Sequence, residues 1–237
     1  MKKAHTMNRT THHLLYGAAL LLLCTSASAQ WTLRGGVTNI SPNSSASDAT
    51  GPMLPGPPSG ISIDVKDKAT VYFSVAYGFN PNMEVELALG YPPTHDVNAK
   101  IASFLPAQIQ AFDGQRVARV RQVAPTLFFN YKFGEASSAW RPFVGIGLNY
   151  TNFDKRTSTA ANNALNGGPT DLHLSDSWGL AAQAGLSYRV DNHWSITGSV
   201  ATASVKTRLT TSTAGVQRNI DIRFHPVVLT LTAGYTF

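Results

Sequence analysis

Few side chains in this sequence are placed to make or break covalent bonds. His193 lies two residues from Ser195, and His95 directly precedes Asp96, which are residue types found in Ser-His-Asp catalysis. Such a triad needs three side chains that converge in space, and neighbours along the chain do not supply it. An Asp and a His at 171 and 173 are too few ligands for a metal site. We therefore expect no enzymatic activity, no bound metal and no cofactor.

A second set of residues has a spacing that indicates ion pairing. Arg34, Glu86 and Lys132 each lie on the polar face of a segment in which apolar and polar residues alternate. All three fall near the same expected end of their segments. Ionised groups buried away from water must pair, so we hypothesise an Arg34–Glu86–Lys132 network that closes one end of an enclosed sheet. The alternative is a set of solvated charges at its mouth, and the sequence leaves both open.

The segments that carry these charges read as β-strands, and the last of them is the clearest. Residues 226–237, PVVLTLTAGYTF, place Val227, Leu229, Leu231 and further apolar residues on one face and mainly threonines on the other. A strand turns successive side chains to opposite faces. The length suits a strand that crosses a bilayer in a barrel. A soluble edge strand could alternate in the same way, but the aromatic ending favours the barrel.

Eight segments have this character, and the connections between them alternate in length. Short turns at 80–82, 134–140 and 191–192 alternate with long stretches at 41–68, 98–116, 154–176 and 207–225. This pattern predicts an all-β fold, an eight-stranded antiparallel transmembrane β-barrel with short periplasmic turns and long extracellular loops. The expected strands are Trp31–Ile40, Ala69–Phe79, Met83–Tyr91, Val117–Phe133, Arg141–Phe153, Ser177–Val190, His193–Lys206 and Pro226–Phe237.

Aromatic residues gather near the expected strand ends, as two girdles at the membrane interfaces would require. Ordinary use of aromatic residues in strands is the alternative. The residues are Trp31, Phe79, Tyr91, Phe133, Tyr150, Phe153, Trp178, Tyr188, Trp194, Tyr235 and Phe237.

Residues 1–29 have the features of a cleaved signal peptide, and 30–237 would form the barrel. Basic residues precede the apolar run Leu14–Leu23, and Ala27-Ser28-Ala29 is a cleavage motif. Lipidation at Cys24 is the alternative, but Leu23 before it is not small. Removal takes away three of the 19 basic residues, which leaves 16 against 13 acidic ones and a net charge of +3. Without a Lys/Arg run, the mature chain has no footprint for nucleic acid.

Many residues on the predicted inner faces are small. Because an eight-stranded barrel is narrow, side chains fill its interior or leave room for one small ligand. Phe128 is the one large apolar residue assigned inward. We expect the ligand contacts to be Ala88, Phe128, Gly145, Gly147, Ala181, Ser199 and Ala201. Simple packing inside the barrel is the alternative role for each.

The central segments carry a family resemblance. Residues 123–153, VAPTLFFNYKFGEASSAWRPFVGIGLNYTNF, and 171–188, DLHLSDSWGLAAQAGLSY, closely resemble the OmpW family of outer-membrane proteins, which includes the AlkL-type alkane importers. The resemblance implies an eight-stranded barrel in the outer membrane of a Gram-negative cell, with a hydrophobic lumen. It also implies passive admission of small hydrophobic molecules, which are released sideways through the barrel wall into the membrane.

The implied partners are outer-membrane lipid, lipopolysaccharide, a small apolar ligand and, through the C-terminal strand, the barrel-assembly machinery, with the protein a monomer. The alternative function is a non-transporting structural or surface-interaction barrel that acts through its extracellular loops. Two segments depart from the family pattern: the Pro-rich stretch Ser41–Gly60, and Thr197–Ser204, which is small and hydroxylic. A lumen lined by Ser199 and Ala201 would be wider and less apolar.

Overall fold

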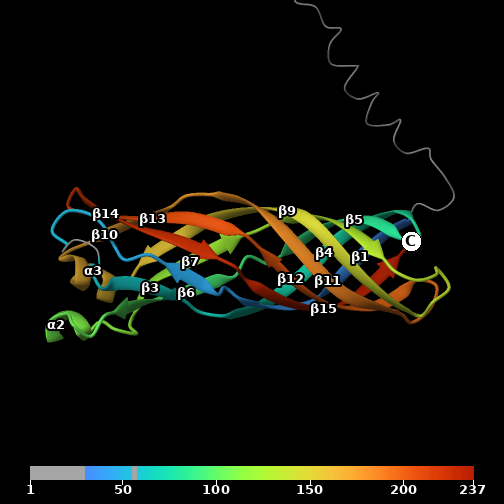
Figure 1. Cartoon of the computed structure of the whole chain (residues 1–237), viewed down its shortest axis with the longest axis horizontal. Coiled ribbons are helices and arrows are strands. Elements are labelled where there is room, and N and C mark those ends of the chain that lie inside the picture. Colours follow the sequence, from blue (N-terminus) through green and yellow to red (C-terminus); the bar gives the residue numbers. More distant parts are fainter. Residues whose placement is uncertain (1–29, 55–57) are drawn as a thin grey trace, which may run out of the picture.

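Eight strands close into a barrel, as the alternation predicted (Figure 1). The computed structural model describes residues 30–54 and 58–237, so the expected signal peptide at 1–29 lies outside the described residues. Around the barrel the order is β1, β4, β5, β8, β9, β11, β12, β15 and back to β1, with all neighbours antiparallel. The strands are β1 (Gln30–Ser41), β4 (Lys68–Asn80), β5 (Met83–Gly90), β8 (Thr126–Lys132), β9 (Trp140–Ser158), β11 (Ser177–Arg189), β12 (Trp194–Ala203) and β15 (Val227–Thr236).

The outer face of this barrel is apolar. Ile146 and Leu180 are 72% and 73% exposed, and most inward residues between such positions are small or polar. Phe143 is a large apolar exception at 4% exposed, so the prediction that Phe128 is the one large apolar residue facing inward is wrong. Aromatic pairs lie at both edges of the band. The ring centroids of Trp140 and Tyr188 are 4.5 Å apart near the short turns, and those of Tyr150 and Trp178 are 4.8 Å apart at the other edge. An apolar band between aromatic rows is the surface that a bilayer requires.

The long connections are present, but they are not irregular loops. Most of their residues form strands and two short helices, α2 (Ala107–Gln110) and α3 (Ala160–Asn166), at the end far from the C-terminus (Figure 1). No helix among residues 30–54 and 58–237 is long and apolar enough to cross a membrane. The added strands are β2 (Ser44–Ala46), β3 (Ile61–Val65), β6 (Thr94–Ile101), β7 (Arg116–Val123), β10 (Thr170–Leu174), β13 (Val205–Thr213) and β14 (Val216–Phe224).

Seven strands break where the barrel meets this extension, and only β9 crosses without interruption. The strand expected at Val117–Phe133 is therefore wrong as one element: Ala124 and Pro125 divide it into β7 and β8. The segment His193–Lys206 is likewise divided at Ser204. Because proline lacks an N–H, Pro125 cannot continue a ladder and favours such a break. Breaks also fall at 42–43, 66–67, 91–93, 175–176 and 225–226.

Above the breaks the polarity of the wall reverses. There β3, β6 and β7 pair in series with the upper part of β9, and β10, β13, β14 and β2 form a separate four-stranded sheet. The large apolar core lies inside this extension, with Val97, Ile101, Leu209 and Ile222 buried in it. Since water surrounds the extension, apolar residues turn inward as in a soluble sheet.

Phe153 lies above the reversal and faces inward, so its assignment to an aromatic girdle is wrong. It is 5% exposed and packs inside the extension, where its ring lies 6.3 Å from that of Phe224.

The reversal generates a paired test. Ile146→Arg places a charge near the middle of the apolar band, and we expect it to lower the free energy of unfolding in lipid vesicles by about 2–4 kcal/mol. His173→Arg, at an exposed outward position on β10, should change it by less than about 0.5 kcal/mol. Equal effects of the two variants in denaturant titrations would contradict the assignment of lipid and water to the two parts of the wall.

Candidate functional site

A buried ion cluster crosses the barrel interior near its short-turn end. Arg34 on β1 donates to both oxygens of Glu84 at 2.9 and 3.0 Å, and its other terminal nitrogen lies 3.0 Å from Glu86. Lys132 on β8 lies 2.6 Å from Glu84. Two cations thus face two carboxylates on β5, and the cluster carries no net charge.

Neutral side chains complete the hydrogen bonding of this cluster. Asn130, which is fully buried, donates to Glu84 at 3.1 Å and to Glu86 at 3.0 Å. Gln183 donates to the side-chain oxygen Oδ1 of Asn130 at 2.7 Å and to Glu86 at 3.2 Å. Ser74 and Tyr72 on β4 donate to Glu86 at 2.6 and 3.2 Å. A buried charge is tolerated when it is paired and hydrogen-bonded in this way.

The three residues expected to form a network lie in one cluster, but not with the expected pairing. Arg34 contacts Glu86, whereas Lys132 pairs with Glu84, which the hypothesis omitted. The signal for Glu84 was in the sequence: it lies two residues from Glu86 and therefore on the same face of the strand. Asn130 lies two residues from Lys132 in the same way. That the cluster seals the periplasmic floor stays a prediction.

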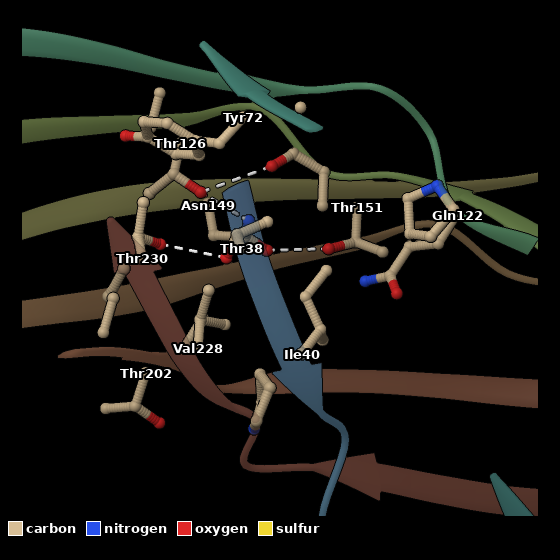
Figure 2. Close-up of a pocket in the computed structure, with 18 of the residues that line it drawn as sticks. Thr38, Ile40, Tyr72, Gln122, Thr126, Asn149, Thr151, Thr202, Val228 and Thr230 are labelled. Atoms are coloured by element: carbon tan, nitrogen blue, oxygen red, sulfur yellow. Dashed lines mark hydrogen bonds between the residues drawn. The ribbon is translucent and has the colours of Figure 1, made fainter. Parts of the chain in front are cut away.

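Above the ion cluster lies a cavity of about 140 Å³ (Figure 2). Five of the expected contacts line it: Ala88, Phe128, Ala181, Ser199 and Ala201. Hydroxyl and amide groups also face it, and many of them bond to one another: Thr38 to Thr230 at 2.9 Å, and Asn149 to Thr126 at 2.8 Å. The side chains that line the cavity therefore leave a surface that is largely apolar.

Gly145 and Gly147 do not line this cavity, which differs from the expectation. A Cβ at Gly145 would lie 2.0 Å from the Asn130 side-chain oxygen, and a Cβ at Gly147 would lie 2.8 Å from the Phe128 ring. These glycines make room for the ion cluster and for the cavity wall.

A second, polar cavity of about 420 Å³ lies on the periplasmic side of the cluster. Arg34, Glu84 and Lys132 line it, and none of its lining residues also lines the upper cavity. The ion cluster thus lies between two cavities that share no lining residue.

The wall beside the upper cavity is thin at one seam. A lipid-facing groove of about 710 Å³ shares Phe128, Ala181, Thr202 and Ala203 with the upper cavity. The ladder between β11 and β12 ends there, at the pair Ala181–Ala203, and one further backbone bond runs from Ser204 N–H to the Leu180 carbonyl oxygen at 2.9 Å. Gly147 lines the groove.

The histidines singled out in the sequence do not assemble a site. His193 stacks on Tyr235 with ring centroids 5.5 Å apart, and His95 bonds to a backbone carbonyl in the extension. Within the described ranges, no group of three or more His, Cys, Asp or Glu side chains could hold a metal ion.

Comparison with known proteins decides the family. The model of the OmpW family matches residues 27–237. The chain belongs to the OmpW family. Outer membrane protein W of Vibrio cholerae is 33% identical over 165 residues, which cover 67% of this chain and 75% of that protein. The chain is thus an outer-membrane barrel protein of the kind found in Gram-negative bacteria, placed among the lipids of that membrane.

Two further relatives extend the comparison. The crystal structure of OprG from Pseudomonas aeruginosa matches with a TM-score of 0.77 at 24% identity, over 89% of this chain and 96% of that one. This likeness supports the fold. The "dibenzothiophene metabolism operon protein PahQ" of Pseudomonas aeruginosa is 24% identical over 209 residues, which cover 87% of this chain and 88% of PahQ.

The packing at Gly145 can be tested with a single methyl group. Gly145→Ala should lower the melting temperature of the folded barrel, because the added carbon overlaps the Asn130 amide; we expect a loss of about 1–3 kcal/mol. Gly35→Ala is the matched control, since nothing lies within 4 Å of its Cβ position. Heat-modifiable gel mobility measures both. A normal melting profile for Gly145→Ala would show that the cluster is not tightly packed there.

The ion cluster as a seal makes a separate prediction. Glu86→Ala removes one carboxylate and leaves Asn130, Gln183 and Ser74 without their shared acceptor, so we expect a loss of about 3–5 kcal/mol and an increase in single-channel conductance. Both are measured on the refolded barrel, the conductance in planar bilayers. Unchanged melting and conductance would remove the seal hypothesis.

Proposed function

We propose that this protein is an outer-membrane channel that passively admits small hydrophobic molecules and releases them sideways into the membrane. The observation that carries the proposal is a largely apolar cavity above a closed ion cluster, beside a thin seam in the barrel wall. The relative named for a dibenzothiophene metabolism operon supports an aromatic, apolar substrate class.

The proposed path begins in the extension and ends in lipid. A molecule moves through the apolar interior of the extension to the cavity above Phe128, where the ion cluster blocks direct passage to the periplasm. An apolar molecule has a lower free energy in the apolar groove beyond Phe128 and Ala181 than beside the ion cluster, so it moves toward the groove. Separation of β11 from β12 above Ala181 breaks few backbone hydrogen bonds, because their ladder has already ended.

The driving force in this mechanism is the concentration gradient and partition into lipid. The sequence has no GxxxxGK[ST] phosphate-binding motif that would couple transport to a nucleotide. No side chain is assigned a catalytic role, and no cofactor takes part. Lipopolysaccharide around the extension, a monomeric state and recognition of β15 by the barrel-assembly machinery belong to the same proposal.

A surface-interaction role is the second candidate. The observation that favours it is the folded extension, with its own core and an exposed outer face of charged residues such as Arg208 and Asp221, which pair at 2.7 Å. A folded extension of this kind provides a surface that binds a partner without any transport.

Uptake by cells separates the two candidates. Cells that lack their own barrel of this type are given a radiolabelled short alkane or alkanoate ester, with or without this protein, and a charged small solute for comparison. We expect the protein to speed uptake of the apolar solute alone. Phe128→Arg should abolish the gain, because it places a cation in the cavity wall opposite Glu86, its register partner.

Phe128→Leu is the matched control, since it keeps the wall apolar, and uptake should remain. Heat-modifiable mobility confirms that each variant is folded. Unchanged uptake with a folded wild-type barrel would favour the surface-interaction role. Equal uptake through the Phe128→Arg variant would place the path elsewhere.

A further inference from the structure

Three cavities lie in series along the axis of the molecule. The outermost, of about 190 Å³, shares Ile63, Val97, Ala118 and Leu209 with a middle chamber of about 40 Å³. The middle chamber in turn shares Pro42, Gln122 and Phe224 with the cavity above the ion cluster. The middle chamber is the smallest of the three, so a molecule moving inward is most closely surrounded there.

The lining of the middle chamber is apolar except for two side chains, His95 and Gln122. His95 lies on β6 and is 4% exposed. Its inward direction follows from strand alternation, because His95, Val97, Ala99 and Ile101 are all buried and the residues between them are more exposed. Gln122 lies at the boundary with the inner cavity, where Figure 2 shows it.

The hydrogen bonding of His95 fixes which atom the ring offers. Its Nδ1 lies 3.0 Å from the Lys66 carbonyl oxygen, which can only accept, so Nδ1 carries the proton. Burial lowers the pKa of the His95 imidazole below its usual value of 6.5, and the ring is therefore neutral at neutral pH. Nε2 is then an unprotonated acceptor. Among the described residues no atom makes a hydrogen bond of good geometry to it, although the Gln122 side chain lies near enough to raise the His95 pKa in part.

We propose that the middle chamber is a selectivity subsite for apolar molecules that carry one hydroxyl group, with His95 Nε2 accepting the hydroxyl proton. This assignment rests on the proposed function for its biological role, but the binding itself does not. The chamber has room for the hydroxyl end, and the apolar body extends into the adjoining cavities. The chemical class is therefore aliphatic alcohols and phenols.

The physical basis is the cost of an unsatisfied buried acceptor. A hydrocarbon in the chamber leaves Nε2 without a partner, whereas an alcohol of the same length supplies one. The difference should favour the alcohol by about tenfold in affinity. A molecule with an acceptor but no donor, such as a ketone or ester, gains nothing from Nε2.

Direct binding tests the subsite without any transport. The protein, with its histidine rings isotope-labelled, is placed in lipid nanodiscs at neutral pH, and the nitrogen chemical shifts are followed as octanol or octane is added. We expect octanol alone to move the His95 Nε2 resonance, which is assigned by its absence from His95→Leu. The His173 resonances on exposed β10 should not move. The same response to octane, or no response to octanol, would overturn the proposal.

A competition for uptake tests the selectivity. We expect wild-type protein to admit octanol about tenfold faster than octane relative to protein-free cells, and His95→Leu to reduce this ratio toward one while octane uptake persists. His173→Leu should leave the ratio unchanged. An unchanged ratio in His95→Leu would overturn the selectivity role. Failure of uptake for both solutes, with the NMR response intact, would instead count against the channel and leave the subsite standing.

Discussion

The change from hydrocarbon to water outside the wall is the constraint on which the rest of the structure depends. Within the bilayer every backbone polar group must be bonded inside the protein, so the strands close into a ring with apolar residues outward. Above the bilayer the apolar residues must turn inward. One continuous strand set cannot satisfy both without a change of pattern, and seven strands break at that boundary. The interior consequently has a polar section beneath an apolar one.

β9 shows how a single strand meets both demands. Ile146, Leu148 and Tyr150 face outward in the lower part, opposite the inward Asn149 and Thr151. At Asn152 and Phe153 the positions keep their direction but exchange their polarity, so that Phe153 is the apolar residue inside. Directly above, β9 is bulged: Lys155 has a φ of 42°, and the register against β7 shifts between Arg119 and Arg121.

This exchange also explains what the sequence could and could not predict. Lower strands were predictable because lipid-facing alternation is strong and uninterrupted, as in β15. β6 lies outside the expected strands, and Asn98–Ile101 falls in the expected long stretch 98–116, because polar residues stand here where a membrane strand has apolar ones. The ion cluster was predictable as a set of inward charges, but the partner of Lys132 depends on the register of β8 against β5. β5 and β8 are joined through the long connection 91–125, so no tight turn fixes that register, and it leaves no mark on the alternation.

The uninterrupted β9 has a consequence for the geometry of the cell surface. Its 19 residues, at about 3.3 Å per residue, span about 60 Å, and a strand tilt of about 40° reduces this to roughly 45 Å of height against an apolar band about 25 Å tall. In the proposed function, this difference of about 20 Å would raise the point of entry well above the apolar part of the membrane. A molecule on the proposed path would then pass the polar surface layer of the outer leaflet while enclosed by protein, and the packing and charge of that layer would have little influence on its rate of passage.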